Sequence, residues 1–123
     1  MQVLLVGAGG FVGAIARYLV DTWLGRSFGT AFPWGTVAVN ATGSFVLGLL
    51  FALLIERDLG PADLRIPVLV GFVGAYTTFS TYLLDSWRLV EQGNWPLAAV
   101  NTVGSIALGL VALLVGMTLG RSI

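Results

Sequence analysis

Three long stretches of the chain contain no charged residue, and this feature constrains the fold more than any other. The uncharged stretches are Ser27–Ile55, Ile66–Leu84 and Gln92–Gly120. Each supplies the ~20 residues that a helix needs to cross a bilayer. A fourth apolar stretch, Gln2–Leu24, is interrupted only by Arg17 and Asp21. The sequence therefore predicts an all-α membrane protein with four transmembrane helices.

The composition leaves little room for anything else. The chain has 123 residues, of which 57% are hydrophobic and 10% charged, whereas soluble domains carry about a quarter charged residues. We place the spans at about residues 2–24, 33–55, 66–90 and 95–119, which predicts a single four-helix transmembrane domain over residues 1–123. The absence of histidine and cysteine removes the commonest groups of acid–base and thiol catalysis, so we expect no enzyme. A net charge of zero gives no basic patch for nucleic acid.

Aromatic and basic residues indicate how the spans are oriented. Four tryptophans fall at span ends on one predicted membrane face, at the depth that indole rings prefer: Trp23, Trp34, Trp87 and Trp95. The arginines divide evenly, with three near each face, so there is almost no positive-inside bias. We hypothesise dual topology, with an antiparallel homodimer restoring symmetry. The alternative is that so few charges make the count uninformative.

Glycines recur at helical spacing in several spans. The pairs Gly9/Gly13, Ser44/Gly48, Ser105/Gly109 and Gly116/Gly120 follow the small-xxx-small pattern that lets membrane helices approach closely. Such pairs also arise by chance among 17 glycines. Residues 7–13 further resemble a nucleotide-binding loop, but a second span follows where a parallel sheet would be needed. Helix packing is therefore the favoured interpretation.

The third span contains the densest polar cluster. Residues 76–82 place four hydroxyls among three aromatic rings, just after Gly71 and Gly74. Hydrocarbon offers hydroxyls no partner, so this cluster should face protein, water or an ion. Glycine and threonine weaken a helix. A local break would free carbonyls to hold a cation, as in transporters. An intact helix with hydroxyls bonded to preceding carbonyls is equally compatible with the spacing.

Two further polar stripes lie on the second and fourth spans. Thr36, Asn40 and Ser44 follow one another at four-residue intervals, and so do Asn101, Ser105 and Gly109. Each asparagine amide needs a partner in the membrane. A simple interhelical hydrogen bond is one interpretation. Together with the third span, the two stripes alternatively line a narrow polar path.

The remaining charges near span interiors are Arg17 and Asp85. Either side chain can extend to the interface, and Arg17 can alternatively raise the anion concentration at a pore mouth. The apolar cores contain no acid at mid-depth. A proton-coupled exporter of the small multidrug-resistance type would need one, so that alternative is disfavoured. A non-transporting membrane subunit is a second alternative, but it leaves the Asn40 and Thr77–Thr81 donors without a function.

Three motifs in order resemble one known family, the small Fluc-type fluoride channels. They are Gly9-Gly10-xx-Gly13-Ala14-xx-Arg17-Tyr18, Gly35-Thr36-xx-Val39-Asn40-xx-Gly43-Ser44-Phe45-xx-Gly48 and Gly71-xx-Gly74-xx-Thr77-Thr78-Phe79-Ser80-Thr81. The resemblance covers essentially the whole chain. It implies an antiparallel homodimer with two fluoride pores, and passive fluoride efflux through the inner (plasma) membrane. The expected fold is then the four-helix unit with its third helix broken near its middle.

The resemblance also assigns roles to individual residues. The fluoride pathway is expected to include Asn40, Thr36, Phe79, Ser80, Thr81, Tyr82, Asn101 and Ser105. Arg17 is expected near a pore vestibule, and the carbonyls of Gly74 and Thr77 are expected to hold a structural Na⁺ at the dimer centre. The chain departs from the family pattern at Ala75, Tyr82, Leu83 and Asp85. Tyr82 stands where a second phenylalanine is usual. It keeps an aromatic ring but adds a hydroxyl, which can change how this position binds the anion.

Overall fold

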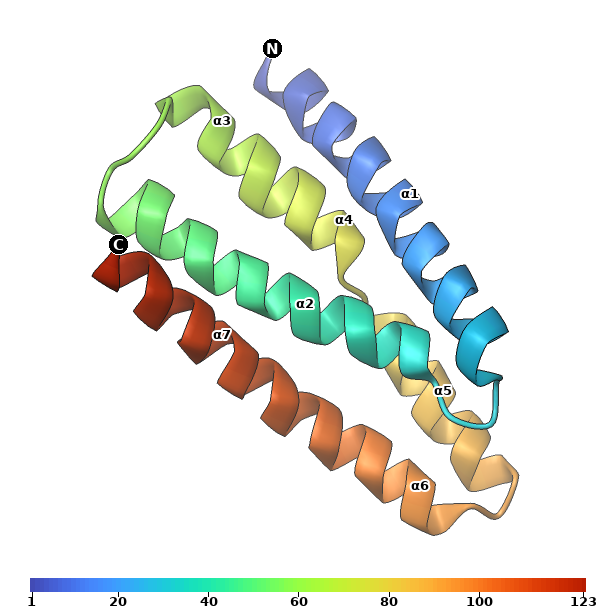
Figure 1. Ribbon diagram of the computed structural model, residues 1–123. Coiled ribbons are helices and arrows are strands. Elements are labelled where there is room, and N and C mark those ends of the chain that lie inside the picture. The colour runs from blue at the N-terminus through green and yellow to red at the C-terminus, as the bar shows by residue number, and fades with distance from the viewer.

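The structure, a computed structural model that describes residues 1–123, contains helices and no strands (Figure 1). Four helical segments are long and apolar enough to cross a membrane: Gln2–Phe28, Trp34–Glu56, Ala62–Glu91 and Trp95–Ser122. The prediction of an all-helical chain with four membrane-capable helices is therefore confirmed. The first, third and last segments each extend a few residues beyond the predicted limits.

The first segment is one continuous helix, whereas the other three contain irregular turns. The elements are α1 (Gln2–Phe28), α2 (Trp34–Phe51), η1 (Ala52–Glu56), α3 (Ala62–Ile66), η2 (Pro67–Val73), α4 (Gly74–Tyr76), α5 (Phe79–Glu91), α6 (Trp95–Ala99), η3 (Val100–Gly104) and α7 (Ser105–Ser122). The three η elements are π-helical turns, a geometry that often occurs at functional sites. Both termini lie at the same end of the bundle (Figure 1).

Glycines set how closely the helices pack. In α1, a Cβ at Gly13 would fall on the carbonyl oxygen of Phe72 in η2. In the pair of α2 and α7, a Cβ at Gly48 would fall on the Leu113 carbonyl, and one at Gly116 on the Phe45 carbonyl. No other residue type permits backbones this close. Glycines of the predicted small-xxx-small pairs thus lie at contacts between helices of one chain.

The two short loops lie at one end, together with the tryptophans. Gly29, with a φ of 80°, ends α1 in a conformation that favours glycine, and the chain turns directly into α2. Gly93, with a φ of 73°, allows the equally short connection from α5 to α6. The four tryptophans flank these loops and are all 48–66% exposed. This arrangement suits rings that lie at a membrane–water interface.

The interior of the bundle is small and partly polar, while its outside is apolar. Only 17 of 123 residues are buried, and they include Thr36, Ser86 and Asn101. Large hydrophobic side chains such as Phe11, Val103 and Leu114 are more than half exposed. This distribution is the reverse of that in a soluble domain, and it fits a chain whose apolar surface meets lipid.

The close glycine contacts predict a stability effect. Gly116→Ala should lower the thermal unfolding temperature in detergent, because the added methyl overlaps the Phe45 carbonyl oxygen. Overpacking of this kind costs about 1–3 kcal/mol. Gly7→Ala is the matched control, since nothing lies within 4 Å of a Cβ at that position. Equal unfolding temperatures for the Gly116→Ala protein and the wild type would contradict the packing described here.

Candidate functional site

An extended dipeptide separates α4 from α5 at the hydroxyl cluster. Thr77 has φ and ψ of −83° and 160°, and Thr78 has −150° and 119°. Asn40 of α2 pairs with Thr78 by two hydrogen bonds. Its Nδ2 donates to the Thr78 carbonyl at 2.8 Å, and the Thr78 N–H donates to Asn40 Oδ1 at 2.7 Å. One amide side chain thus satisfies both backbone groups of Thr78, where the membrane would offer no other partner.

This pairing changes the partners of nearby carbonyls. The Thr78 N–H bonds to Asn40 instead of the Gly74 carbonyl four residues before it. The Thr81 N–H bonds to Thr78 Oγ1 at 3.3 Å, the usual N-cap contact at the start of α5, instead of the Thr77 carbonyl. The carbonyls of Gly74 and Thr77 therefore both lack the donor that a continuous helix would supply. Gly74 is also exposed on the surface of the chain.

The aromatic rings of α5 differ in their surroundings. The Phe79 ring is 70% exposed, whereas Tyr82 is only 5% exposed. Their ring centroids are 5.7 Å apart and the planes are tilted by 37°. Ser80 is exposed beside Phe79, and Thr81 is half-buried. The structure therefore brings Tyr82 into the bundle and leaves Phe79 on its outer surface.

Tyr82 belongs to a hydrogen-bond network with the fourth span. Its hydroxyl donates to the Thr102 carbonyl in the π-helical turn η3, at 2.6 Å. Ser86 Oγ donates to the Tyr82 carbonyl and accepts from Asn101 Nδ2, both at 2.9 Å. Ser105 Oγ donates to Asn101 Oδ1 at 3.2 Å. Asn101 is fully buried. The Tyr82 hydroxyl thus already has an acceptor inside the chain, and Asn101 and Ser105 are bonded to each other.

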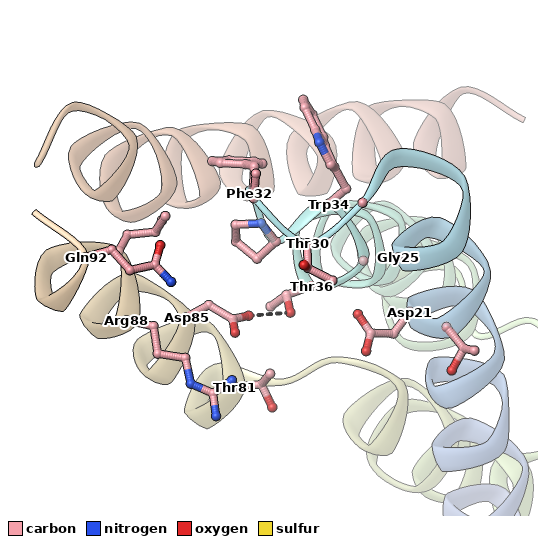
Figure 2. Close-up of a pocket in the computed structure, with 16 residues that line it drawn as sticks. Asp21, Gly25, Thr30, Phe32, Trp34, Thr36, Thr81, Asp85, Arg88 and Gln92 are labelled. Carbon is pink, nitrogen blue, oxygen red and sulfur yellow. Dashed lines mark hydrogen bonds between the residues drawn. The ribbon is translucent and has the colours of Figure 1, made fainter. Parts of the chain in front are cut away.

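A large polar cavity opens at the end that carries the two loops. Its volume is about 660 Å³, and α1, α2, α5 and the loops contribute its walls (Figure 2). At the wall of this cavity, Thr36 Oγ1 donates a hydrogen bond to Asp85 Oδ2 at 2.7 Å. Asp21 faces the same space from α1, and Arg88 faces it from α5 (Figure 2). The Thr36–Asp85 bond therefore joins α2 to α5 at the cavity wall.

Two smaller hollows lie near this cavity and the extended dipeptide. The first, of about 220 Å³, shares Asp21, Thr36 and Thr81 with the large cavity and is also lined by Arg17 and Thr78. The second, of about 210 Å³, has these lining residues: Asn40, Gly43, Ser44, Leu47, Thr77, Thr78 and Phe79. Thr78 lines both smaller hollows. The three spaces thus adjoin one another through shared lining residues, and the last two border Thr78, the backbone partner of Asn40.

Sequence reasoning included Thr78 only as one of the clustered hydroxyls, without a role of its own, and it did not propose Asp21 as a site residue. Thr78 matters through its backbone and as the N-cap of α5, and the Thr78-xx-Thr81 spacing was an available signal. Asp21 lies one helical turn after Arg17, which places both on one face of α1. No group of three acidic, histidine or cysteine side chains is placed to hold a metal ion.

Comparison with known proteins assigns the chain to a family. Residues 4–117 match the family described as CrcB-like protein, Camphor Resistance (CrcB). The chain belongs to this CrcB family. A relative from Magnetococcus marinus, named fluoride-specific ion channel FluC, is 46% identical over the full length of both chains. FluC 1 of Symbiobacterium thermophilum is 46% identical over 98% of each chain, and FluC of Rhizobium leguminosarum is 40% identical. The resemblance drawn from the three sequence motifs is confirmed.

The Tyr82 contact predicts that its hydroxyl stabilises this CrcB protein. Tyr82→Phe should lower the free energy of unfolding by about 1 kcal/mol, because it leaves the Thr102 carbonyl without its donor. Chemical unfolding in detergent, followed by tryptophan fluorescence, measures the change. Tyr18→Phe serves as control, since Tyr18 is 68% exposed and makes no hydrogen bond. A Tyr82→Phe protein as stable as the wild type would contradict the role assigned to this hydroxyl.

Proposed function

We propose that this protein is a fluoride-selective channel of the inner membrane, through which fluoride leaves the cell down its electrochemical gradient. The observation that supports this most is a set of three adjoining hollows beside Asn40. The first two share Thr36 and Thr81 as lining residues, and the last two share Thr78. The names of the full-length relatives agree with this proposal. A channel moves an ion without covalent chemistry, so the protein is not an enzyme.

Neutral donors along the hollows suit a small anion. Thr81 Oγ1 accepts a hydrogen bond from Thr78 Oγ1 at 3.0 Å, so its own proton remains free. Asn40 uses one amide hydrogen with Thr78, and its second hydrogen remains free. Ser80 lines none of the three hollows, but it lies exposed next to Phe79 and makes no side-chain hydrogen bond. Fluoride loses its hydration water only where donors replace it, and uncharged donors bind it weakly enough for exit.

The two aromatic rings complete the proposed pathway. Ring edges carry partial positive charge and can face an anion where a full positive charge would be costly. Phe79 lines the innermost hollow together with Asn40. The Tyr82 hydroxyl is engaged by Thr102, so Tyr82 would meet the anion through its ring. Arg17, which lines the middle hollow, would raise the local anion concentration.

An antiparallel homodimer is part of the proposal. Gly74 and Ser80 expose polar groups at a depth where lipid gives no hydrogen bonds. Phe79, which lines the innermost hollow, is also 70% exposed. A second copy covering this face would close the pathway. The even division of arginines between the two ends permits the two copies to insert in opposite orientations.

The carbonyls of Gly74 and Thr77 fit a structural Na⁺ at the centre of such a dimer. Both lack the helical donor that would otherwise occupy them, because the Thr78 and Thr81 N–H groups bond elsewhere. Hard cations bind oxygen ligands, and backbone carbonyls are among them. One chain offers two carbonyls, so a second copy would have to supply the matching pair. The ion would fix the two copies across their shared face.

The alternative functions explain less of the structure. A small multidrug-resistance-type exporter needs an acid within the membrane, whereas the acids here lie at the cavity mouth, at Asp21 and Asp85. A non-transporting membrane subunit leaves the free donors of Asn40 and Thr81 unused. Both alternatives remain distinguishable by ion flux.

The first experiment follows fluoride efflux from liposomes that contain the purified protein, with an ion-selective electrode. The wild type should release fluoride rapidly and retain chloride. Asn40→Asp should reduce fluoride efflux at least about tenfold, because a carboxylate has no N–H to donate and repels the anion. Size-exclusion elution of the Asn40→Asp protein checks that it still folds. Absence of fluoride efflux from well-folded wild type, or equal efflux of chloride, would overturn the proposed function.

Removal of sodium tests the proposed cation. Protein purified with N-methylglucamine in place of Na⁺ should unfold at a lower temperature and lose fluoride efflux, and added Na⁺ should restore both. The readout is thermal unfolding in detergent together with efflux from liposomes. If the unfolding temperature is the same in saturating Na⁺ as in the absence of Na⁺, a structural sodium ion is excluded.

A further inference from the structure

The second and fourth spans run side by side in the same direction, with a constant register. Arg121 bonds to Glu56, 65 residues earlier, at 2.7 Å. Contacts with the same sequence separation occur deeper in the bundle. A Cβ on Gly48 would meet Leu113, and one on Gly109 would meet Ser44 Oγ at 3.5 Å. Figure 1 shows α2 and α7 in this parallel arrangement. The two polar stripes predicted from the sequence therefore lie level with each other.

Ser44 differs from the threonine hydroxyls at comparable positions within the second and fourth spans. Thr42, Thr102 and Thr118 each donate to the carbonyl four residues before them, at 2.6–2.8 Å. Such bonds within a helix are the usual way to satisfy a hydroxyl in a membrane. Ser44 makes no hydrogen bond at all, although it lies in the middle of α2. Its hydroxyl therefore keeps a free proton.

The Ser44 side chain borders the innermost polar hollow. That hollow, of about 210 Å³, is also lined by Asn40, Thr77 and Phe79. Asn40 lies one helical turn before Ser44 on the same face of α2 and has a free amide hydrogen. Two neutral donors thus follow each other along one wall of the same space.

The polar stripe of the fourth span has no side chain at the level of Ser44. Ser105 bonds to Asn101, but the next position of the stripe is Gly109, which has no side chain. Ser44 Oγ lies directly against this gap. We propose that Ser44 is a further fluoride-binding residue, which supplies from α2 the hydroxyl that α7 lacks at Gly109. This inference rests on the proposed function, since it adds a donor to the same pathway.

The test is fluoride efflux from liposomes with a variant at Ser44. Ser44→Ala should lower the efflux rate about tenfold, the effect expected when one hydrogen bond to a charged partner is lost. The variant should fold normally, because the hydroxyl that it removes has no bonding partner in the chain; its unfolding temperature checks this. Thr118→Ala is the control with unchanged efflux, since Thr118 bonds only to its own helix.

A second substitution distinguishes a donor from a space-filling side chain. In the Ser44→Ala background, Gly109→Ser should restore efflux, because it returns a hydroxyl to the same gap from the other helix. A Cβ at this position would lie in ordinary contact, 3.5 Å from the nearest atom. Gly109→Ala in the same background adds the carbon without the hydroxyl and should leave efflux low.

The outcomes separate this inference from the proposed function. Absence of fluoride efflux from the wild type overturns the proposed function itself. Normal wild-type efflux with unchanged efflux in Ser44→Ala overturns only the role of Ser44. Equal efflux in the two double variants also overturns it, because the hydroxyl would then make no difference. Restoration by serine but not by alanine supports the proposal.

Discussion

The double hydrogen bond between Asn40 and the Thr78 backbone holds the centre of this structure together. It satisfies an extended residue inside a membrane-capable segment, where an unpaired N–H or carbonyl would cost several kcal/mol. It also ties α2 to the start of α5. Because the Thr78 N–H bonds to Asn40, it does not bond to the Gly74 carbonyl. Thr78 also lines both of the smaller hollows. Loss of this one amide would leave several backbone groups without partners.

Close helix packing and polar lining depend on each other in this chain. Gly48 and Gly116 allow α2 and α7 to touch through their backbones, which fixes the level of every side chain along the two helices. The same register brings Ser44 against Gly109. On the other side of the bundle, Gly13 lets α1 approach η2. The hollows thus keep their shape because small residues, rather than flexible side chains, separate the helices.

Individual residues show how far sequence reasoning reached. The four membrane-capable helices and the family followed from uncharged runs and three motifs, because hydrophobic length and motif spacing are local properties. The partner of the Tyr82 hydroxyl did not follow. Its acceptor, the Thr102 carbonyl, lies 20 residues away in a π-helical turn, which no sequence periodicity indicates. Likewise, the burial of Asn101 against Ser86 depends on how α5 meets the fourth span.

The sequence by itself determined that the chain is helical, suited to a membrane and a member of the CrcB family. Bilayer thickness and hydrocarbon polarity act on each segment separately, so composition decides the first two points, whereas the family follows from the spacing of the motifs. Only the tertiary structure decided which donors are used and which stay free. Asn40, Thr36 and Ser105 are bonded within the chain, whereas Ser44 is not. Hydrogen-bond partners are set by the relative placement of helices, which no single span contains.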